Sequence, residues 1–205
     1  MNDFFPEEPK KLKERISRYK RQLKKGDRDG AGKRYLVGPM YQLLGNNDGA
    51  LEYYNWFKKE YEDDSGEPYM CICWALALYQ GGLKAEAVKK LQTAMLSNLY
   101  LIPLLLNKPL KKLDAWLGSN WEWQEYAEEV PQELLRLWGD EEKSWADQLY
   151  YSPEFVNDRK RYIEIHEQLK GLPPSQKRSD LVMESHSMRY GNDEDVEVPH
   201  LRLVK

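Results

Sequence analysis

A weak internal repeat between residues 34 and 97 limits the folds open to this chain. When the sequence is compared with itself at a shift of 37 residues, small residues mostly align with small residues and large apolar residues with large apolar residues. The aligned pairs are Gly38 with Ala75, Tyr41 with Leu78, Gly45 with Gly82, Ala50 with Ala87, Tyr54 with Leu91 and Phe57 with Ala94. Repeated units of this kind stack on one another, because one unit cannot bury its apolar side alone.

The same region is divided into helical segments by short breaks. Glycine and polar turns separate four predicted helices, over residues 34–44, 49–62, 69–80 and 84–96. No stretch shows the strict alternation of a strand, and β-branched residues are scarce. These patterns predict an all-α fold of helical hairpins. The small residues of the repeat, Ala50 and Ala87 among them, are expected where the two helices of a hairpin cross closely.

This pattern resembles the tetratricopeptide repeat (TPR), a helical hairpin in which bulky, small and aromatic residues recur. The matching residues are Val37-Gly38-x-x-Tyr41 with Ala50-x-x-x-Tyr54, and Trp74-Ala75-x-x-Leu78 with Ala87-x-x-x-Leu91. The departures are Arg34 and Cys71 in place of a bulky first aromatic, Pro39 within the first helix, and a spacing of 37 residues where ~34 is usual. The resemblance implies a TPR-like α-solenoid of two hairpins.

A second and looser resemblance begins at Asn98. The segment over residues 98–110, with Pro103 and Pro109, is similar to the segment that closes the repeats in poorly characterised bacterial TPR proteins related to the suppressor of tumorigenicity 7 family. Leu99 replaces the first proline of that segment. The two resemblances together cover roughly residues 34–145, and they imply a fold and a binding role without identifying a partner.

Charge is distributed unevenly along the chain. Residues 10–34 hold twelve basic and three acidic side chains, a net charge of +9, so the remainder must carry −12 for the total of −3. Leu12, Ile16, Tyr19 and Leu23 form the apolar stripe of an amphipathic helix over residues 10–25. Its basic candidates for binding are Lys13, Arg18, Lys20, Arg21, Lys24 and Lys25. This basic helix could cover the acidic body, contact an acidic protein, or bind phosphate groups.

Three regions are predicted from these patterns. Residues 1–30 form the basic N-terminal helix and a linker, and residues 31–170 form the TPR-like domain with capping helices over 120–138 and 153–170. Residues 171–205 hold few bulky apolar side chains and are expected to form a mobile tail.

Motifs of catalysis or metal binding are absent from the sequence. It contains no Gly-rich phosphate loop ending in Lys-Ser/Thr, no His-Glu-x-x-His, no Gly-x-Ser-x-Gly and no Cys-x-x-Cys. Cys71 and Cys73 would point to opposite faces of a helix, as buried reduced thiols. His166 lacks a second histidine at helical spacing with which to share a metal. We therefore expect no enzymatic activity and no cofactor or metal.

The expected function is protein binding. In repeat arrays the first helix of each hairpin lines a concave groove, and the residues at these positions are Tyr35, Gln42, Ile72 and Tyr79. A partner protein or peptide is expected there, and nucleic acid bound by the basic helix is the alternative. The N-terminus lacks the pattern of a secretory signal, and the apolar run over residues 99–106 is shorter than the ~20 residues that cross a bilayer. We expect a cytoplasmic protein without a membrane segment.

Overall fold

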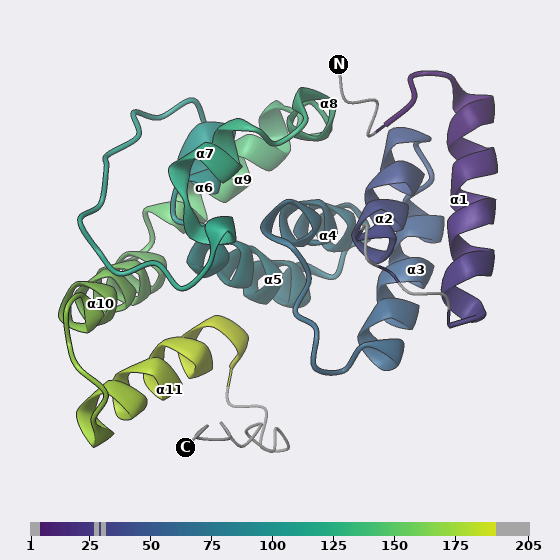
Figure 1. The fold of residues 1–205 in the computed structure, drawn as a ribbon. Coiled ribbons are helices and arrows are strands. Elements are labelled where there is room, and N and C mark those ends of the chain that lie inside the picture. Colours follow the sequence, from purple (N-terminus) through teal and green to yellow (C-terminus); the bar gives the residue numbers. More distant parts are fainter. Residues whose placement is uncertain (1–4, 27–28, 30–31, 192–205) are drawn as a thin grey trace.

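The computed structural model describes residues 5–26, 29 and 32–191, and this part of the chain is helical with no strand (Figure 1). The all-α prediction is confirmed. The elements are α1 (Pro9–Lys24), α2 (Lys33–Leu43), α3 (Asn47–Glu60), α4 (Pro68–Gln80), α5 (Lys84–Ser97), α6 (Leu101–Leu105), the 3-10 helix η1 (Asn120–Glu122), α7 (Gln124–Glu128), α8 (Gln132–Leu135), α9 (Asp140–Tyr150), α10 (Pro153–Leu169) and α11 (Gln176–Tyr190).

Two helical hairpins form the centre of the molecule. Helix α2 packs against α3, α4 packs against α5, and α4 also contacts both helices of the first hairpin. Ala50 and Ala87 are fully buried, as expected for residues at close helix crossings. Gly38 lies against the Tyr54 ring, and a Cβ atom at this position would lie only 2.7 Å from the Tyr54 hydroxyl oxygen. Small side chains therefore permit the close approach of α2 and α3.

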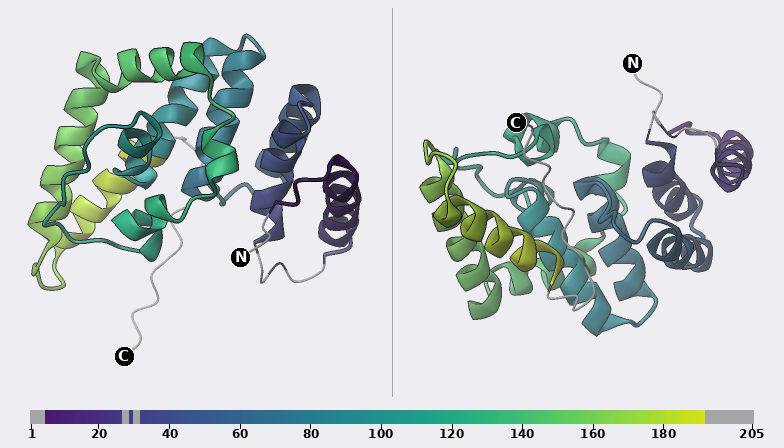
Figure 2. Two further views of the ribbon diagram at one scale, coloured as in Figure 1. Left: turned by 90° about the horizontal axis from the view of Figure 1, so that it is seen from above. Right: turned by 60° about the horizontal axis from the view of Figure 1, so that its bottom comes forward.

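Helix α1 packs against α2 through its apolar stripe. Leu12, Ile16 and Leu23 are buried, whereas Tyr19 is half-buried. Pro9 begins the helix, where its fixed φ is favourable and its missing N–H is not needed. Figure 2 shows α1 at one edge of the molecule, with α10 and α11 at the opposite edge. Within this structure, the basic helix is thus docked on the protein's own body.

The capping region differs from its prediction. In place of one helix over residues 120–138, the chain forms the short elements η1, α7 and α8. Trp123 is extended between η1 and α7, and Pro131 precedes α8, where proline disfavours a helical conformation of Val130. The second predicted helix is confirmed as α10, which begins at Pro153 after Ser152, whose Oγ accepts a hydrogen bond from Phe155 N at 3.4 Å.

The predicted mobile tail is wrong for residues 176–190, which form α11. This helix packs against α10 and α5. Its N-terminus is capped by Ser175, and Leu181 is buried. Polar contacts hold the rest of it: Arg161 makes two hydrogen bonds of 2.7 Å to Glu184, and Arg189 pairs with Glu122. The part of the predicted tail over residues 192–205 lies outside the described residues.

Candidate functional site

The expected groove is the first candidate site, and the structure corrects it. Tyr35 is 6% exposed, Gln42 7% and Ile72 0%. These three side chains are therefore not available to a partner in this structure. Tyr79 is half-buried and still reaches the surface. Residues 120–145 of the same chain, called the covering segment below, contact Tyr35 through Trp121 and Tyr79 through Trp145. Gln42 is instead buried between the two hairpins.

Aromatic side chains of the covering segment occupy the places expected for a partner. Trp121 packs edge-on against Tyr35 with ring centroids 6.0 Å apart. Trp145 packs on Tyr79 at 4.4 Å, and the Tyr79 hydroxyl donates a hydrogen bond of 3.1 Å to Glu141 Oε1. Asn98 holds the start of the covering segment in place, because its Nδ2 donates hydrogen bonds to the carbonyl oxygens of Trp121 and Trp123 at 2.6 and 2.9 Å.

The buried groove residues have structural partners. The Tyr35 hydroxyl donates to Asp64 Oδ2 at 2.8 Å and accepts from Arg34 Nη2 at 2.7 Å, and burial raises the pKa of Tyr35. Gln42 joins the two hairpins, because its Nε2 donates to the Cys73 carbonyl at 2.8 Å while its Oε1 accepts from the Tyr54 hydroxyl at 3.0 Å. These bonds satisfy polar groups inside the core.

A small hollow remains beside Gln42. Its volume is about 160 Å³, and its lining residues are Gln42, Gly45, Asn47, Leu76, Gln80 and Leu137. Leu137 comes from the covering segment and closes one side. The hollow lies between the ends of α2 and α4, on the side where the concave groove was expected.

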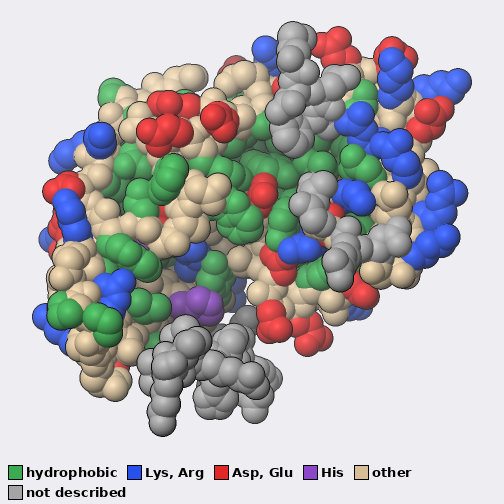
Figure 3. Space-filling view, in the orientation of Figure 1, with side chains coloured by type: hydrophobic (Ala, Val, Ile, Leu, Met, Phe, Trp, Pro, Cys, Tyr) green, Lys and Arg blue, Asp and Glu red, His purple; other side chains and the backbone are tan. Residues whose placement is uncertain are grey.

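The basic face of α1 is the second candidate site. We use this name for Lys10, Lys13, Arg18, Arg21, Lys24 and Lys25, which are all exposed. Lys10 was not among the predicted candidates, although its three-residue spacing from Lys13 places it on the same face. Lys20, which was predicted, is half-buried and donates a hydrogen bond of 3.1 Å to the Tyr41 hydroxyl. Figure 3 shows these cations as a blue edge of the molecule over α1.

The charges of this face are not neutralised by the body. In the part of the chain that the structure describes, none of the six cations forms an ion pair. Arg18 lies over the ring of its neighbour Tyr19 at 5.4 Å. The apolar stripe and the Lys20–Tyr41 hydrogen bond hold the helix on α2, and the cations of the basic face are exposed to solvent.

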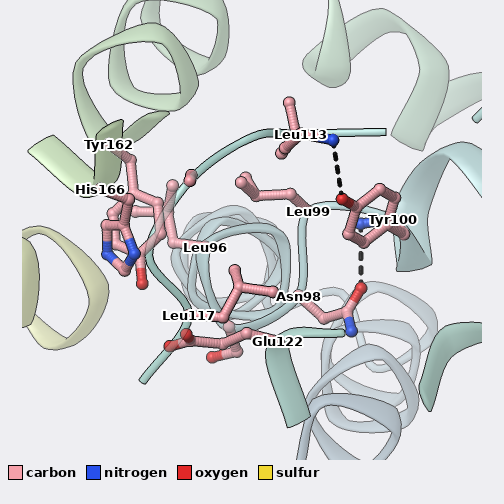
Figure 4. A pocket seen from close by; sticks show the side chains of 11 residues that line it. Leu96, Asn98, Leu99, Tyr100, Leu113, Leu117, Glu122, Tyr162 and His166 are labelled. Carbon is pink, nitrogen blue, oxygen red and sulfur yellow. Dashed lines mark hydrogen bonds between the residues drawn. The ribbon is translucent and has the colours of Figure 1, made fainter. Parts of the chain in front are cut away.

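A third candidate is a cavity between α5, α10 and the loop over residues 107–119 (Figure 4). Its residues include Asn98, Tyr100, Glu122, Tyr162 and His166. The cavity volume is about 10 Å³, which is close to the space that one water molecule requires. An organic substrate does not fit there.

The two cysteine thiols are buried. Cys71 and Cys73 are free, and burial raises the pKa of both thiols, which disfavours the nucleophilic thiolate. Within residues 5–26, 29 and 32–191, no three His, Cys, Asp or Glu side chains are grouped so that they could hold a metal ion.

No helix in this same part of the chain is both long and apolar enough to cross a bilayer. Comparison with protein-family models, curated proteins and solved structures gives no match.

Proposed function

We propose that this protein is a non-catalytic binding module that recognises an acidic segment of a partner protein through the basic face of α1. The supporting observation is that six exposed cations share one face of a helix and have no ion-pair partner in the described part of the chain. The hairpins α2–α3 and α4–α5 are, in this proposal, a TPR-like framework that holds α1 in place.

Pre-organisation supports a role in recognition. Helix α1 has 16 residues and is about 24 Å long at 1.5 Å per residue. Because Leu12, Ile16 and Leu23 anchor it, the backbone of the basic face is already ordered before a partner arrives. Binding then costs mainly the ordering of long side chains, about 0.5–1.5 kcal/mol for each one that is immobilised.

Two observations favour an acidic protein segment over nucleic acid. The basic face carries no exposed ring on which a base could stack, since Tyr19 is half-buried beside it. In addition, the sequence outside residues 10–34 has a net charge of −12 and would repel a polyanion that extends beyond α1. A short acidic segment that is limited to the length of α1 avoids this repulsion.

The experiment compares two triple variants of the full chain. Lys13→Gln/Arg21→Gln/Lys24→Gln removes three charges from the basic face, and Lys58→Gln/Lys59→Gln/Lys89→Gln removes three exposed cations elsewhere. Each variant is titrated with a fluorescent oligoglutamate peptide at several salt concentrations. Exposed ion pairs contribute about 0.2–1 kcal/mol each, so the first variant should bind about three- to 150-fold more weakly. The second should match the unmodified protein.

The outcomes separate the alternatives. Equal losses in both variants would show that net charge, and not the basic face, controls binding, and would refute the proposal. Tighter binding to a short DNA duplex than to the peptide, lost only in the first variant, would assign nucleic-acid binding to this face instead. Absence of binding to either probe at low salt would also contradict the proposal.

A further inference from the structure

A short acidic segment follows helix α11 in the sequence. Residues 193–197 read Asp-Glu-Asp-Val-Glu, so four of the five side chains are carboxylates. The other run with four carboxylates in five residues, over 60–64, is part of the folded body, where Asp64 accepts hydrogen bonds from Arg34 and Tyr35. The segment over 193–197 begins two residues after Gly191, the C-cap of α11. The end of α11 therefore determines where this acidic segment starts.

The basic face of α1 matches the acidic segment in charge and in length. Its six cations are exposed, and none of them forms an ion pair within the described part of the chain. Lys13 and Lys24 are separated by about 16 Å along the helix axis, at 1.5 Å per residue. Five extended residues span at most about 16–18 Å. The acidic segment is therefore long enough to cover the face from Lys13 to Lys24.

The basic face of the same copy is out of reach of this segment. Figure 2 shows α11 and α1 at opposite edges of the molecule, and packing connects them through α5, α4 and α2. The axes of packed helices are about 8–10 Å apart, so these four steps amount to about 32–40 Å. Residues 192–197 extend at most about 22 Å from Gly191. The face that the segment can reach is that of a second copy.

We infer that residues 193–197 of one copy bind the basic face of α1 on a second copy, so that the protein associates with itself. This inference rests on the proposed function, because it names the acidic protein segment that the basic face receives. Each copy carries one segment and one face, so two copies can form the same contact twice. The second contact forms within the complex and raises the overall affinity. An acidic segment of another protein would compete for the same face.

Sedimentation velocity at several protein concentrations tests the association. At about 10 mM salt, where the Debye length is about 30 Å, the sedimentation coefficient of the unmodified chain should rise with concentration. At about 1 M salt, where this length is about 3 Å, it should keep the monomer value. A chain that is monomeric at every concentration in low salt would overturn the inference.

Two matched variants locate the acidic contact. Asp193→Asn/Glu194→Gln/Asp195→Asn/Glu197→Gln removes the four charges of the segment, and this variant should remain monomeric. The control removes four exposed carboxylates of the folded body and should associate like the unmodified chain; it is Glu52→Gln/Glu60→Gln/Glu86→Gln/Glu129→Gln. Equal loss of association in both variants would show that total charge controls it, and would refute the role of the segment.

An exchange of charges tests whether the two surfaces contact each other. One variant reverses charges of the face, as Lys13→Glu/Arg21→Glu/Lys24→Glu, and a second variant changes all four acids of the segment to lysine. Each variant alone should be monomeric, because its face and its segment no longer carry opposite charges. An equimolar mixture should associate, since the unchanged segment of the first variant can bind the unchanged face of the second. A mixture that stays monomeric would contradict the inference.

Titration with the oligoglutamate peptide separates this inference from the proposed function. Removal of the four segment charges should tighten peptide binding, because the competing segment is lost. If the unmodified chain is monomeric and binds the peptide as well as the segment variant does, self-association is refuted while the proposed function stands. If neither protein binds the peptide, the basic face does not receive acidic segments and both proposals fail.

Discussion

Replacement of Gly38 by alanine should destabilise this protein although alanine is the better helix former. The new Cβ would lie 2.7 Å from the Tyr54 hydroxyl oxygen and closer still to two ring carbons, whereas carbon contacts are optimal at about 3.5–4.0 Å. Tyr54 cannot move away easily, because it is fully buried and stacked on Trp74 with ring centroids 4.9 Å apart. Its hydroxyl also bonds Gln42.

The magnitude follows from three contributions. Overpacking costs about 1–3 kcal/mol, and loss of the Tyr54–Gln42 hydrogen bond costs about 1 kcal/mol. The higher helix propensity of alanine than of glycine stabilises the folded state by about 1 kcal/mol. The free energy of unfolding should therefore fall by about 1–3 kcal/mol. For a chain of this size, this corresponds to a decrease of about 2–12 °C in Tm.

The assay is urea unfolding followed by circular dichroism, in two backgrounds. In the Tyr54→Leu background the ring is absent, and adding Gly38→Ala would reproduce the aligned pair Ala75 and Leu91 of the second hairpin. The Gly38→Ala change should there be neutral or stabilising, so the double-mutant cycle should show a coupling of at least about 1 kcal/mol. Equal effects in both backgrounds, or no loss in the unmodified background, would refute the close contact as the cause.

Three further predictions concern the core and its titrating groups. Ala50→Leu and Ala87→Leu should each lower the free energy of unfolding by about 1–3 kcal/mol, because both sites are fully buried; neutral urea midpoints for both would contradict the hairpin crossings. Burial lowers the pKa of His166 and His186 below 6.5, so the unfolded chain binds more protons and stability should fall as pH drops below about 6.5. His166→Gln and His186→Gln should each flatten this part of the stability–pH curve, and an unchanged slope in both would refute the assignment. Arg189→Leu leaves Glu122 buried without its cation, and should lower the free energy of unfolding by about 3–5 kcal/mol. Limited proteolysis should then cleave α11 faster than in the unmodified chain, and an equal rate would show that the Arg189–Glu122 pair does not hold this helix.

The central helices could be predicted because their signals are local. The four predicted segments between residues 34 and 96 end within two residues of the observed bounds of α2 to α5. Glycines at the turns and the periodic apolar positions determine these bounds. Gly38 and Ala50 could be assigned to a helix crossing for the same reason, since their size and spacing are visible in the sequence.

The candidate site could not be predicted in the same way, because it depends on contacts between distant segments. Tyr35 has the position expected of a groove residue, but its ring is in contact with Trp121, which belongs to another segment. Helix α11 has few apolar residues, and its Arg189 pairs with Glu122, which lies 67 residues earlier in the chain. Local periodicity contains no information on such pairs, whereas the basic face of α1 was visible because its residues share one helix.

Other helices of the chain cover both ends of the hairpin pair. In a stack of repeats, each unit contacts only its neighbours, so a further hairpin would need an uncovered end to pack against. Here α1 lies against α2 at one end, while α10 and α11 lie against α5 at the other. An inserted third hairpin would have to displace one of these helices and expose its apolar contacts to water. Duplication of the central hairpins alone would therefore not extend the stack without a loss of these contacts.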